Sequence, residues 1–221
     1  DFYAVYDETD EKNILTFYCN GNFKTWDGKT NITAFTLPTE ATSANDWKYN
    51  GIRGEVKEII IDSSVNKCHG LKSTAYMFSD FINAESITGA EYLDVSSVTN
   101  MDSMFRTFGA NIKTFNAVPN LANWNTGKVT NMDSMFWNYG NESKELKTVP
   151  NVQGWDTSSV TKLRRMFSNY GNSSTELDFT LDLRDWDLSN VYTDWFSSPD
   201  IGFDMFYEAG ENAANWNVIR P

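Results

Sequence analysis

One eight-residue segment, VTNMDSMF, occurs twice in this chain, at positions 98–105 and again at 129–136. A third version, VTKLRRMF, occupies 160–167, so the copies follow one another at a constant step of 31 residues (129 − 98 and 160 − 129). Val191 stands one further step along the chain. A fixed period of this size is typical of proteins in which copies of one supersecondary unit stack on their neighbours. The repeat therefore constrains the fold more strongly than any single motif.

Each copy has the residue pattern of a short amphipathic α-helix. In the first copy the apolar residues fall on one helical stripe, at Val98, Met101, Met104, Phe105 and Phe108. The threonine and aspartate of VTNMD have the spacing of an N-terminal cap. A glycine follows the stripe in every copy, at the place where a helix commonly ends: Gly109, Gly140 and Gly171. The pattern predicts a helix of about three turns in each repeat.

A second apolar track follows each glycine and ends at a tryptophan. The tryptophans Trp124, Trp155 and Trp186 repeat the same 31-residue step (155 − 124 and 186 − 155), which favours packing between units over ligand stacking. Alternation over 177–183 predicts a strand with one buried side. We therefore predict an α/β solenoid with leucine-rich-repeat-like coils, each made of a short strand or extended segment and a short helix. Its predicted core is Val98, Met101, Met104, Phe105, Trp124, Val129, Met132, Met135, Phe136, Trp155, Val160, Met166, Phe167 and Trp186.

The first part of the chain has a different, β-rich pattern. Alternating apolar runs at 2–7 and 14–19 flank a polar stretch and predict a β-hairpin, and further strands are expected within 31–37 and 56–61. We assign 1–70 to a β-rich N-terminal cap that covers the end of the repeat array. The repeat region spans 71–221, with a degenerate first unit, full units near 93–123, 124–154 and 155–185, and a last unit, 186–221, interrupted by an insertion.

The repeat resembles a known family. The pattern W-[DN]-T-S-x-V-T-x-M-x-x-M-F, present here as WNTGKVTNMDSMF and WDTSSVTKLRRMF, is similar to the repeat of the BspA-like leucine-rich-repeat proteins of bacterial surfaces. The resemblance implies an extracellular protein of a bacterial surface, anchored or secreted, that takes part in adhesion to host proteins or other cells. It supplies no catalytic residues. The period of this chain is longer than the unit common in that family, which weakens inferences about a shared binding face.

Charge and composition narrow the classes of partner. The chain has 18 Lys and Arg residues against 30 Asp and Glu residues, a net charge of −12, so nucleic acid and anionic membranes would repel it. No apolar run reaches the length of about 20 residues that spans a bilayer. The chain begins at Asp1 without a signal peptide, which suggests a trimmed or mature form. Its two cysteines, Cys19 and Cys68, are compatible with one disulfide or with two buried thiols.

Residues with the potential for catalysis are few. His69 is the single histidine, and neither a nucleophile motif nor a zinc ligand set accompanies it. The acidic residues Asp178, Asp182, Asp185 and Asp187 lie close in sequence, as a glycosidase pair or a calcium site would require. We interpret them as a solvated loop face. No metal and no cofactor is expected, and a glycoside-active enzyme is the least favoured hypothesis.

Candidate binding residues are those that differ between copies of the repeat while the residues around them stay the same. Arg106, Trp137 and Asn169 follow the repeated phenylalanine closely and differ from copy to copy, so we interpret them as one variable register of a recognition face. Trp195, beside the insertion, is a further candidate, and Trp26, Trp47 and Tyr49 are aromatic residues of the cap.

These features favour a non-enzymatic bacterial cell-surface or secreted domain that mediates adhesion or protein–protein recognition. The alternative is a carbohydrate-binding module that uses the tryptophans outside the repeat register. The expected partner is accordingly a host or bacterial surface protein, or a glycan.

Overall fold

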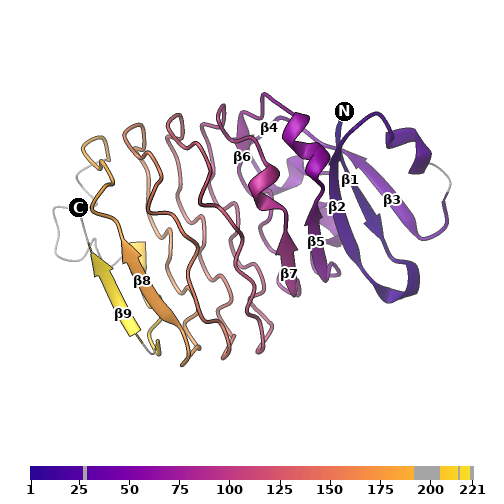
Figure 1. The fold of residues 1–221 in the computed structure, drawn as a ribbon. Coiled ribbons are helices and arrows are strands. Elements are labelled where there is room, and N and C mark those ends of the chain that lie inside the picture. The colour runs from indigo at the N-terminus through magenta and orange to yellow at the C-terminus, as the bar shows by residue number, and fades with distance from the viewer. Residues whose placement is uncertain (27–28, 192–204, 214, 220–221) are drawn as a thin grey trace.

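The computed structural model describes residues 1–26, 29–191, 205–213 and 215–219. Its largest sheet has five strands in the order β3-β1-β2-β5-β7 and occupies the N-terminal end of the molecule (Figure 1). These strands are β1 (Phe2–Asp7), β2 (Ile14–Cys19), β3 (Ile32–Thr36), β5 (Glu58–Ile61) and β7 (Ser86–Thr88). Because β7 follows residue 70, the sheet extends past the predicted boundary of the cap and overlaps the start of the repeats.

The predicted hairpin is confirmed. β1 and β2 pair antiparallel from Phe2 opposite Cys19 to Asp7 opposite Ile14. The strand predicted within 31–37 is present as β3, which pairs with the other edge of β1, and the strand predicted within 56–61 is present as β5. Alternate residues of β5 are buried, as the period of a strand with one covered face requires. From β2 onward the pairing is parallel, to β5 and then to β7.

The remaining regular elements are short. β4 (Glu40–Ala41) pairs with β6 (Ser73–Thr74), and β8 (Asp178–Asp182) pairs with β9 (Asn215–Ile219), both in parallel. The described residues also contain short 3₁₀ helices: η1 (Thr9–Glu11), η2 (Phe23–Trp26), η3 (Ala44–Asp46), η4 (Asn50–Ile52), η5 (Ser63–Lys67) and η6 (Ala90–Tyr92).

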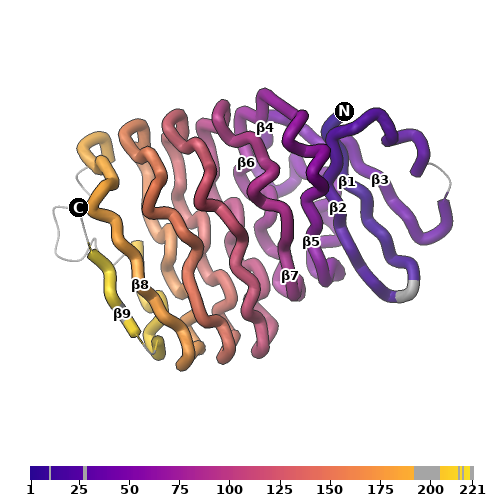
Figure 2. The backbone as a smooth tube through the Cα atoms, viewed as in Figure 1, coloured from indigo at the N-terminus to yellow at the C-terminus, as the bar shows by residue number. Residues whose placement is uncertain are grey.

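The repeated segments run side by side, as the backbone tube in Figure 2 shows. Bridges join Ser73 to Asn100, Asn100 to Asn131 and Asn131 to Lys162. We call the bridged segments rows and number them along the chain: row 1 is 73–82, row 2 is 100–109, row 3 is 131–140, row 4 is 162–171 and row 5 is 205–210. Each row lies next to its successor in sequence.

Alternate backbone amides of a row donate to the next row. The Phe105 amide donates to the Met135 carbonyl at 2.8 Å, and the Thr107 amide donates to the Trp137 carbonyl at 2.7 Å. Amides between these positions close turns within their own row, as the Phe108 amide does with the Phe105 carbonyl at 3.2 Å. Every second donor is therefore used between rows, whereas an α-helix would use them all within one segment.

Consecutive turns take the place of the predicted helices. Ser103 and Thr107 have φ values of 54° and 55°, in the left-handed region that an α-helix excludes. The equivalent residues of rows 3 and 4 repeat this conformation: Ser134, Asn138, Arg165 and Asn169. The strands of the described residues form open sheets that are neither closed nor coiled. The predicted α/β solenoid of leucine-rich-repeat-like coils is therefore wrong.

The glycine at the end of rows 2 to 5 is required by the turn and not by a helix end. Gly109 has φ +62°, and a Cβ atom built on it would lie 2.4 Å from the ring of Phe115. A side chain at this position would be strained by its backbone angle and would collide with a buried aromatic ring.

The core consists of side chains stacked from row to row. The rings of Phe105 and Phe136 are 5.4 Å apart and nearly parallel, and those of Phe136 and Phe167 are 5.3 Å apart. Tyr139 and Tyr170 stack in the same way at 5.2 Å. The structure buries all fourteen residues of the predicted core, including the three tryptophans at the ends of the apolar tracks.

The repeated tryptophans also make the same polar contact. The indole Nε1 of Trp155 donates to the Leu121 carbonyl at 3.1 Å, and Trp186 donates to the Val152 carbonyl at 3.1 Å. Each indole thus satisfies a buried carbonyl 34 residues earlier while its ring packs in the core.

One disulfide cross-links the cap. Cys19 at the end of β2 forms a disulfide with Cys68, with Cα atoms 5.7 Å apart. This bond decides between the two states that the sequence left open.

Within the described part of the chain no helix is long and apolar enough to cross a membrane.

Candidate recognition surface

The rows align the residues that follow the repeated phenylalanine. Because the Thr107 amide pairs with Trp137 and the Asn138 amide pairs with Ser168, the ladder places Arg106, Trp137 and Ser168 in one register. The Asn169 amide donates to the Tyr207 carbonyl, which adds Tyr207 of row 5 to the same line. At this register Arg106 and Trp137 are half-buried and Tyr207 is exposed, whereas Ser168 is buried.

Trp137 is half-buried between two arginines. The guanidinium of Arg106, from row 2, lies 4.8 Å from the centre of the indole ring. The guanidinium of Arg165, from row 4, lies 5.9 Å from it. Both distances are within the range of a cation–π interaction, so the three side chains hold one another in place across three rows. We call the surface formed by Arg106, Trp137, Arg165 and Tyr207 the tryptophan face.

The two arginines keep their charges available. Among the described residues, neither Arg106 nor Arg165 has a carboxylate within ion-pair distance. The Nε atom of Arg106 is buried and has no hydrogen-bond partner within this part of the chain. On a chain with a net charge of −12, these two guanidinium groups are positive charges that no carboxylate of the described residues pairs with. Tyr207 adds an aromatic ring that is 46% exposed.

Asn169 does not belong to the register in which the sequence analysis placed it. Ser168, which is buried, occupies that position in row 4, and Asn169 lies one residue further along, opposite Asn138. The Asn169 amide group donates to the Asn138 side-chain oxygen at 2.8 Å. Its own side-chain oxygen is buried without a partner among the described residues. Asn169 therefore borders the tryptophan face and links rows 3 and 4.

Two aspartates, Asp102 and Asp133, occupy equivalent positions of rows 2 and 3. Asp133 accepts a hydrogen bond from the backbone amide of Arg164 at 2.7 Å. Its partial burial, together with the charge of Asp102 at the same register, raises the pKa of the Asp133 carboxyl, although the Arg164 amide opposes this shift. Both carboxylates thus already accept hydrogen bonds within the array of rows.

The other aromatic candidates have different surroundings. Trp195 lies outside the described residues. Trp47 and Tyr49 are fully buried and donate to the Ala75 carbonyl at 2.7 Å and the Met77 carbonyl at 2.8 Å. Trp26 stacks on Tyr18 and has the ammonium of Lys29 4.5 Å from its ring. Sequence reasoning did not separate these structural roles from surface exposure, because burial depends on the tertiary packing.

Sequence reasoning also missed two members of the tryptophan face. Arg165 occupies a position that is serine in rows 2 and 3, so a comparison of that register would have marked it as variable. Tyr207 directly follows the Met205-Phe206 pair of row 5, as Arg106 follows Met104-Phe105. Aligning the interrupted last unit on this pair would have found it.

The polar residues considered for catalysis come from two parts of the chain: His69 follows η5, whereas the four aspartates lie on β8 and in the segment directly after it. His69 is an exposed side chain whose Nδ1 lies 2.7 Å from Asp94 Oδ2. Asp182 binds the guanidinium of Arg184, which lowers the pKa of Asp182 to about 2, and Asp187 accepts hydrogen bonds from Ser189. Among the described residues no group of three or more His, Cys, Asp or Glu side chains could hold a metal ion. An open hollow of about 530 Å³ lies beside β3 and η3, in the cap.

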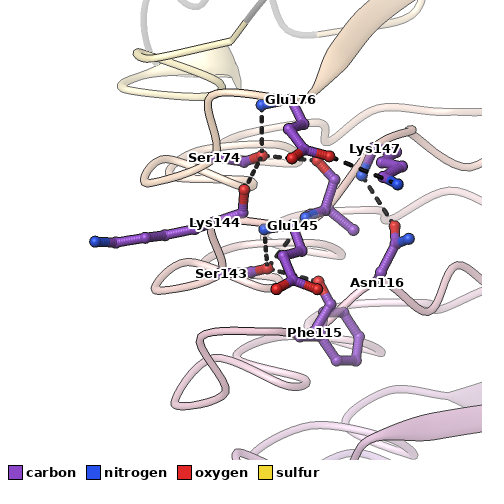
Figure 3. A network of polar contacts seen from close by, with 9 residues as sticks. Phe115, Asn116, Ser143, Lys144, Glu145, Lys147, Ser174 and Glu176 are labelled. Atoms are coloured by element: carbon purple, nitrogen blue, oxygen red, sulfur yellow. Dashed lines mark hydrogen bonds and ion pairs between the residues drawn. The ribbon is translucent and has the colours of Figure 1, made fainter.

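A polar network connects rows at the loops that follow the glycines, and Figure 3 shows it from close by. The buried hydroxyl of Ser143 donates to the Phe115 carbonyl at 2.5 Å, and that of Ser174 donates to the Leu146 carbonyl at 2.8 Å. Lys147 and Glu176 form an exposed ion pair at 3.6 Å. The hydroxyls of the repeated serines have their hydrogen-bond partners within the molecule, so this network holds the loops together. The tryptophan face is therefore the better candidate for binding a partner.

A comparison with known protein families finds a match to the repeat region. Residues 72–218 match the family described as "Mycoplasma protein of unknown function, DUF285". The chain belongs to this family. The match agrees with the coarser part of the sequence resemblance, a repeat family of bacterial surfaces, and does not confirm the specific BspA leucine-rich-repeat motif. Neither comparison with curated proteins nor comparison with solved structures finds a match to this chain.

Proposed function

We propose that this chain is a non-enzymatic binding domain of a bacterial cell surface, or a secreted one, and that it recognises another protein through the tryptophan face. The observation that carries the proposal is the contact of Trp137 with guanidinium groups from both neighbouring rows. Backbone pairing between rows does not need these side chains, because the same register holds serine in row 4.

The composition of the face fits protein recognition. Tryptophan, tyrosine and arginine are the residues most enriched among those that dominate the binding energy of protein interfaces. Here Arg106, Trp137, Arg165 and Tyr207 belong to four successive rows of one array. A surface that is held in place by its own cation–π contacts loses little conformational freedom when a partner binds.

The disulfide and the family resemblance support the location. A bond such as Cys19–Cys68 forms and persists in oxidising compartments, which include the outside of bacterial cells. The finer resemblance of the repeat to BspA-like proteins supports adhesion as the role of the binding.

Carbohydrate binding through Trp137 is the second candidate, because a half-exposed indole can stack on a sugar ring. Two guanidinium groups already contact this indole, so a sugar would compete with at least one of them. This competition favours the protein partner.

The test is binding of the labelled chain to bacterial and host cells, measured by flow cytometry. Trp137→Ala should lower binding strongly, whereas Tyr92→Ala, which removes an aromatic side chain that is 37% exposed elsewhere, should leave it unchanged. Protease treatment of the cells should abolish binding if the partner is a protein. Loss of binding after periodate or glycosidase treatment alone would instead support the carbohydrate alternative, and equal binding by both variants would refute a role for the face.

A further inference from the structure

We infer that the partner segment that binds the tryptophan face is acidic, with carboxylates that pair with Arg106 and Arg165 on either side of Trp137. This inference rests on the proposed function and specifies the chemistry of the partner.

A guanidinium group on this chain can pair with a carboxylate of the same chain. Arg184 does so, with its guanidinium nitrogen 2.6 Å from Asp182. Arg106 and Arg165 pair with an aromatic ring instead and have no ion-pair partner among the described residues. A guanidinium that stacks on an indole keeps its N–H edge directed away from the ring and able to donate to a carboxylate in the plane of the group.

The intramolecular acids nearest in register are engaged elsewhere. Asp80 accepts hydrogen bonds from the hydroxyls of Thr107 and Ser79. Asp133 accepts from the Arg164 amide, and Asp102 accepts from the Ser103 hydroxyl. These acids border the face and would repel carboxylates that approach away from the arginines. The charge pattern therefore favours a segment that places its acids over Arg106 and Arg165 and an apolar group over the exposed part of Trp137.

The experiment uses a short fluorescein-labelled oligoglutamate peptide and an oligoglutamine peptide of the same length, with binding followed by fluorescence anisotropy. The wild-type chain should bind oligoglutamate at least about fivefold more tightly than oligoglutamine. The double variant Arg106→Gln, Arg165→Gln should lose most of this preference. A matched control, Lys24→Gln with Lys48→Gln, removes the same two charges from exposed positions of the cap and should retain it.

Salt separates a contact effect from the general field of the protein. The ratio of wild-type to double-variant affinity should fall toward one as salt rises from about 0.05 M to about 0.5 M, because exposed ion pairs are screened. Equal binding of the two peptides, or an equal loss in the lysine control, would overturn the inference. Circular dichroism of each variant checks folding, and the peptide preference and salt response of the wild-type chain stand independently of any variant.

The same peptides distinguish this inference from the proposed function. Oligoglutamate should compete with cell binding, and oligoglutamine should not. Cell binding that needs Trp137 but is not inhibited by oligoglutamate would leave the proposed function intact and refute the acidic partner. Absence of any cell binding that depends on Trp137 would refute the proposed function itself.

Discussion

The carbonyls of Asp102, Met104 and Arg106 in row 2 accept hydrogen bonds from backbone amides of row 1, at 2.8 to 2.9 Å. The carbonyls at the same register of row 1 have no preceding row. They belong to Ala75, Met77 and Ser79, and the cap supplies their donors from the side chains of Trp47, Tyr49 and Arg53. These carbonyls of row 2 are thus paired by backbone amides, whereas the equivalent carbonyls of row 1 are paired by three side chains from one segment of the cap.

The rows and the cap therefore place different requirements on the sequence. Backbone pairing works for almost any side chain, so a single register of the rows can vary, as it does at Arg106, Trp137 and Ser168. The cap depends on three particular donors: an indole N–H, a phenol O–H and a guanidinium, one for each of the three carbonyls. Recognition residues are therefore expected on the rows, and stability in the cap is expected to be sensitive to small chemical changes.

Arg53 shows how specific the cap contacts are. It is 3% exposed, its guanidinium donates to the Ser79 carbonyl and hydroxyl, and it lies 5.3 Å from the ring of Phe81. Burial lowers the pKa of Arg53, while the nearby Tyr49 and Asp80 oppose the shift. A buried cation held by dipoles and aromatic rings is a costly arrangement, which makes this contact specific to the junction of cap and row 1.

The largest expected effect is a charge in the interior of the rows. Met104 is fully buried, so Met104→Asp should cost several kcal/mol, about 4 or more, or prevent folding. Asp102→Asn, on the outward side of the same row, should cost only about a few tenths of a kcal/mol. Thermal and urea unfolding measure both variants. Similar losses in the two would contradict the assignment of inner and outer sides.

Removal of the disulfide tests the cap next. Cys19→Ser with Cys68→Ser should lower the free energy of unfolding by about 2–4 kcal/mol, because the bond closes a loop with a sequence separation of 49 residues. Wild-type protein in a reducing agent should show the same loss in a urea titration. An unchanged midpoint for both samples would mean that the cap does not depend on the bond.

A single hydroxyl in the cap should have a measurable effect. Tyr49→Phe leaves the Met77 carbonyl without its donor, which should cost about 1–2 kcal/mol because both groups are buried. Tyr92→Phe, at an exposed tyrosine, should change the melting temperature little. Equal melting temperatures for the two variants would mean that the side-chain donors of the cap are not needed to pair the carbonyls of row 1. That result would contradict the contrast between the cap and the rows.

The smallest expected effects concern pH. Asp133 has a raised pKa in the folded state, so its charged form is disfavoured by folding and this penalty appears as pH rises through the carboxyl range. Asp133→Asn, which keeps an oxygen acceptor for Arg164, should therefore stabilise the chain at neutral pH by about a few tenths of a kcal/mol. The difference should vanish in acid.

Asp94 provides a control of opposite sign. The Ser96 hydroxyl, and then His69, lower the pKa of the Asp94 carboxyl, so its charge stabilises the folded state above the carboxyl range and this contribution is lost as pH falls through the lowered pKa. Asp94→Asn should destabilise the chain at neutral pH. Melting curves between acid and neutral pH that move in the same direction for both variants would contradict these environments.

Much of the candidate face could be found from sequence, and some of it could not. Arg106 and Trp137 stand out because the residues around them repeat while they differ. Asn169 was placed one residue out of register. Arg106 and Trp137 directly follow their phenylalanines, and the residue that directly follows Phe167 is Ser168, which the hydrogen bonds align with Trp137. The approach of Arg165 to the indole depends on side chains from rows 3 and 4, which no local pattern contains.

Residue types alone predict the step of 31 residues, the residues that stack in the core and the first hairpin, because burial and alternation leave direct patterns in them. How each repeat folds depends instead on contacts between rows. An apolar stripe at helical spacing also fits a chain of turns with the same side chains inward, and the choice depends on where the backbone amides find acceptors. Here a neighbouring row offers carbonyls such as that of Met135 to every second amide, so turns form where a helix was predicted.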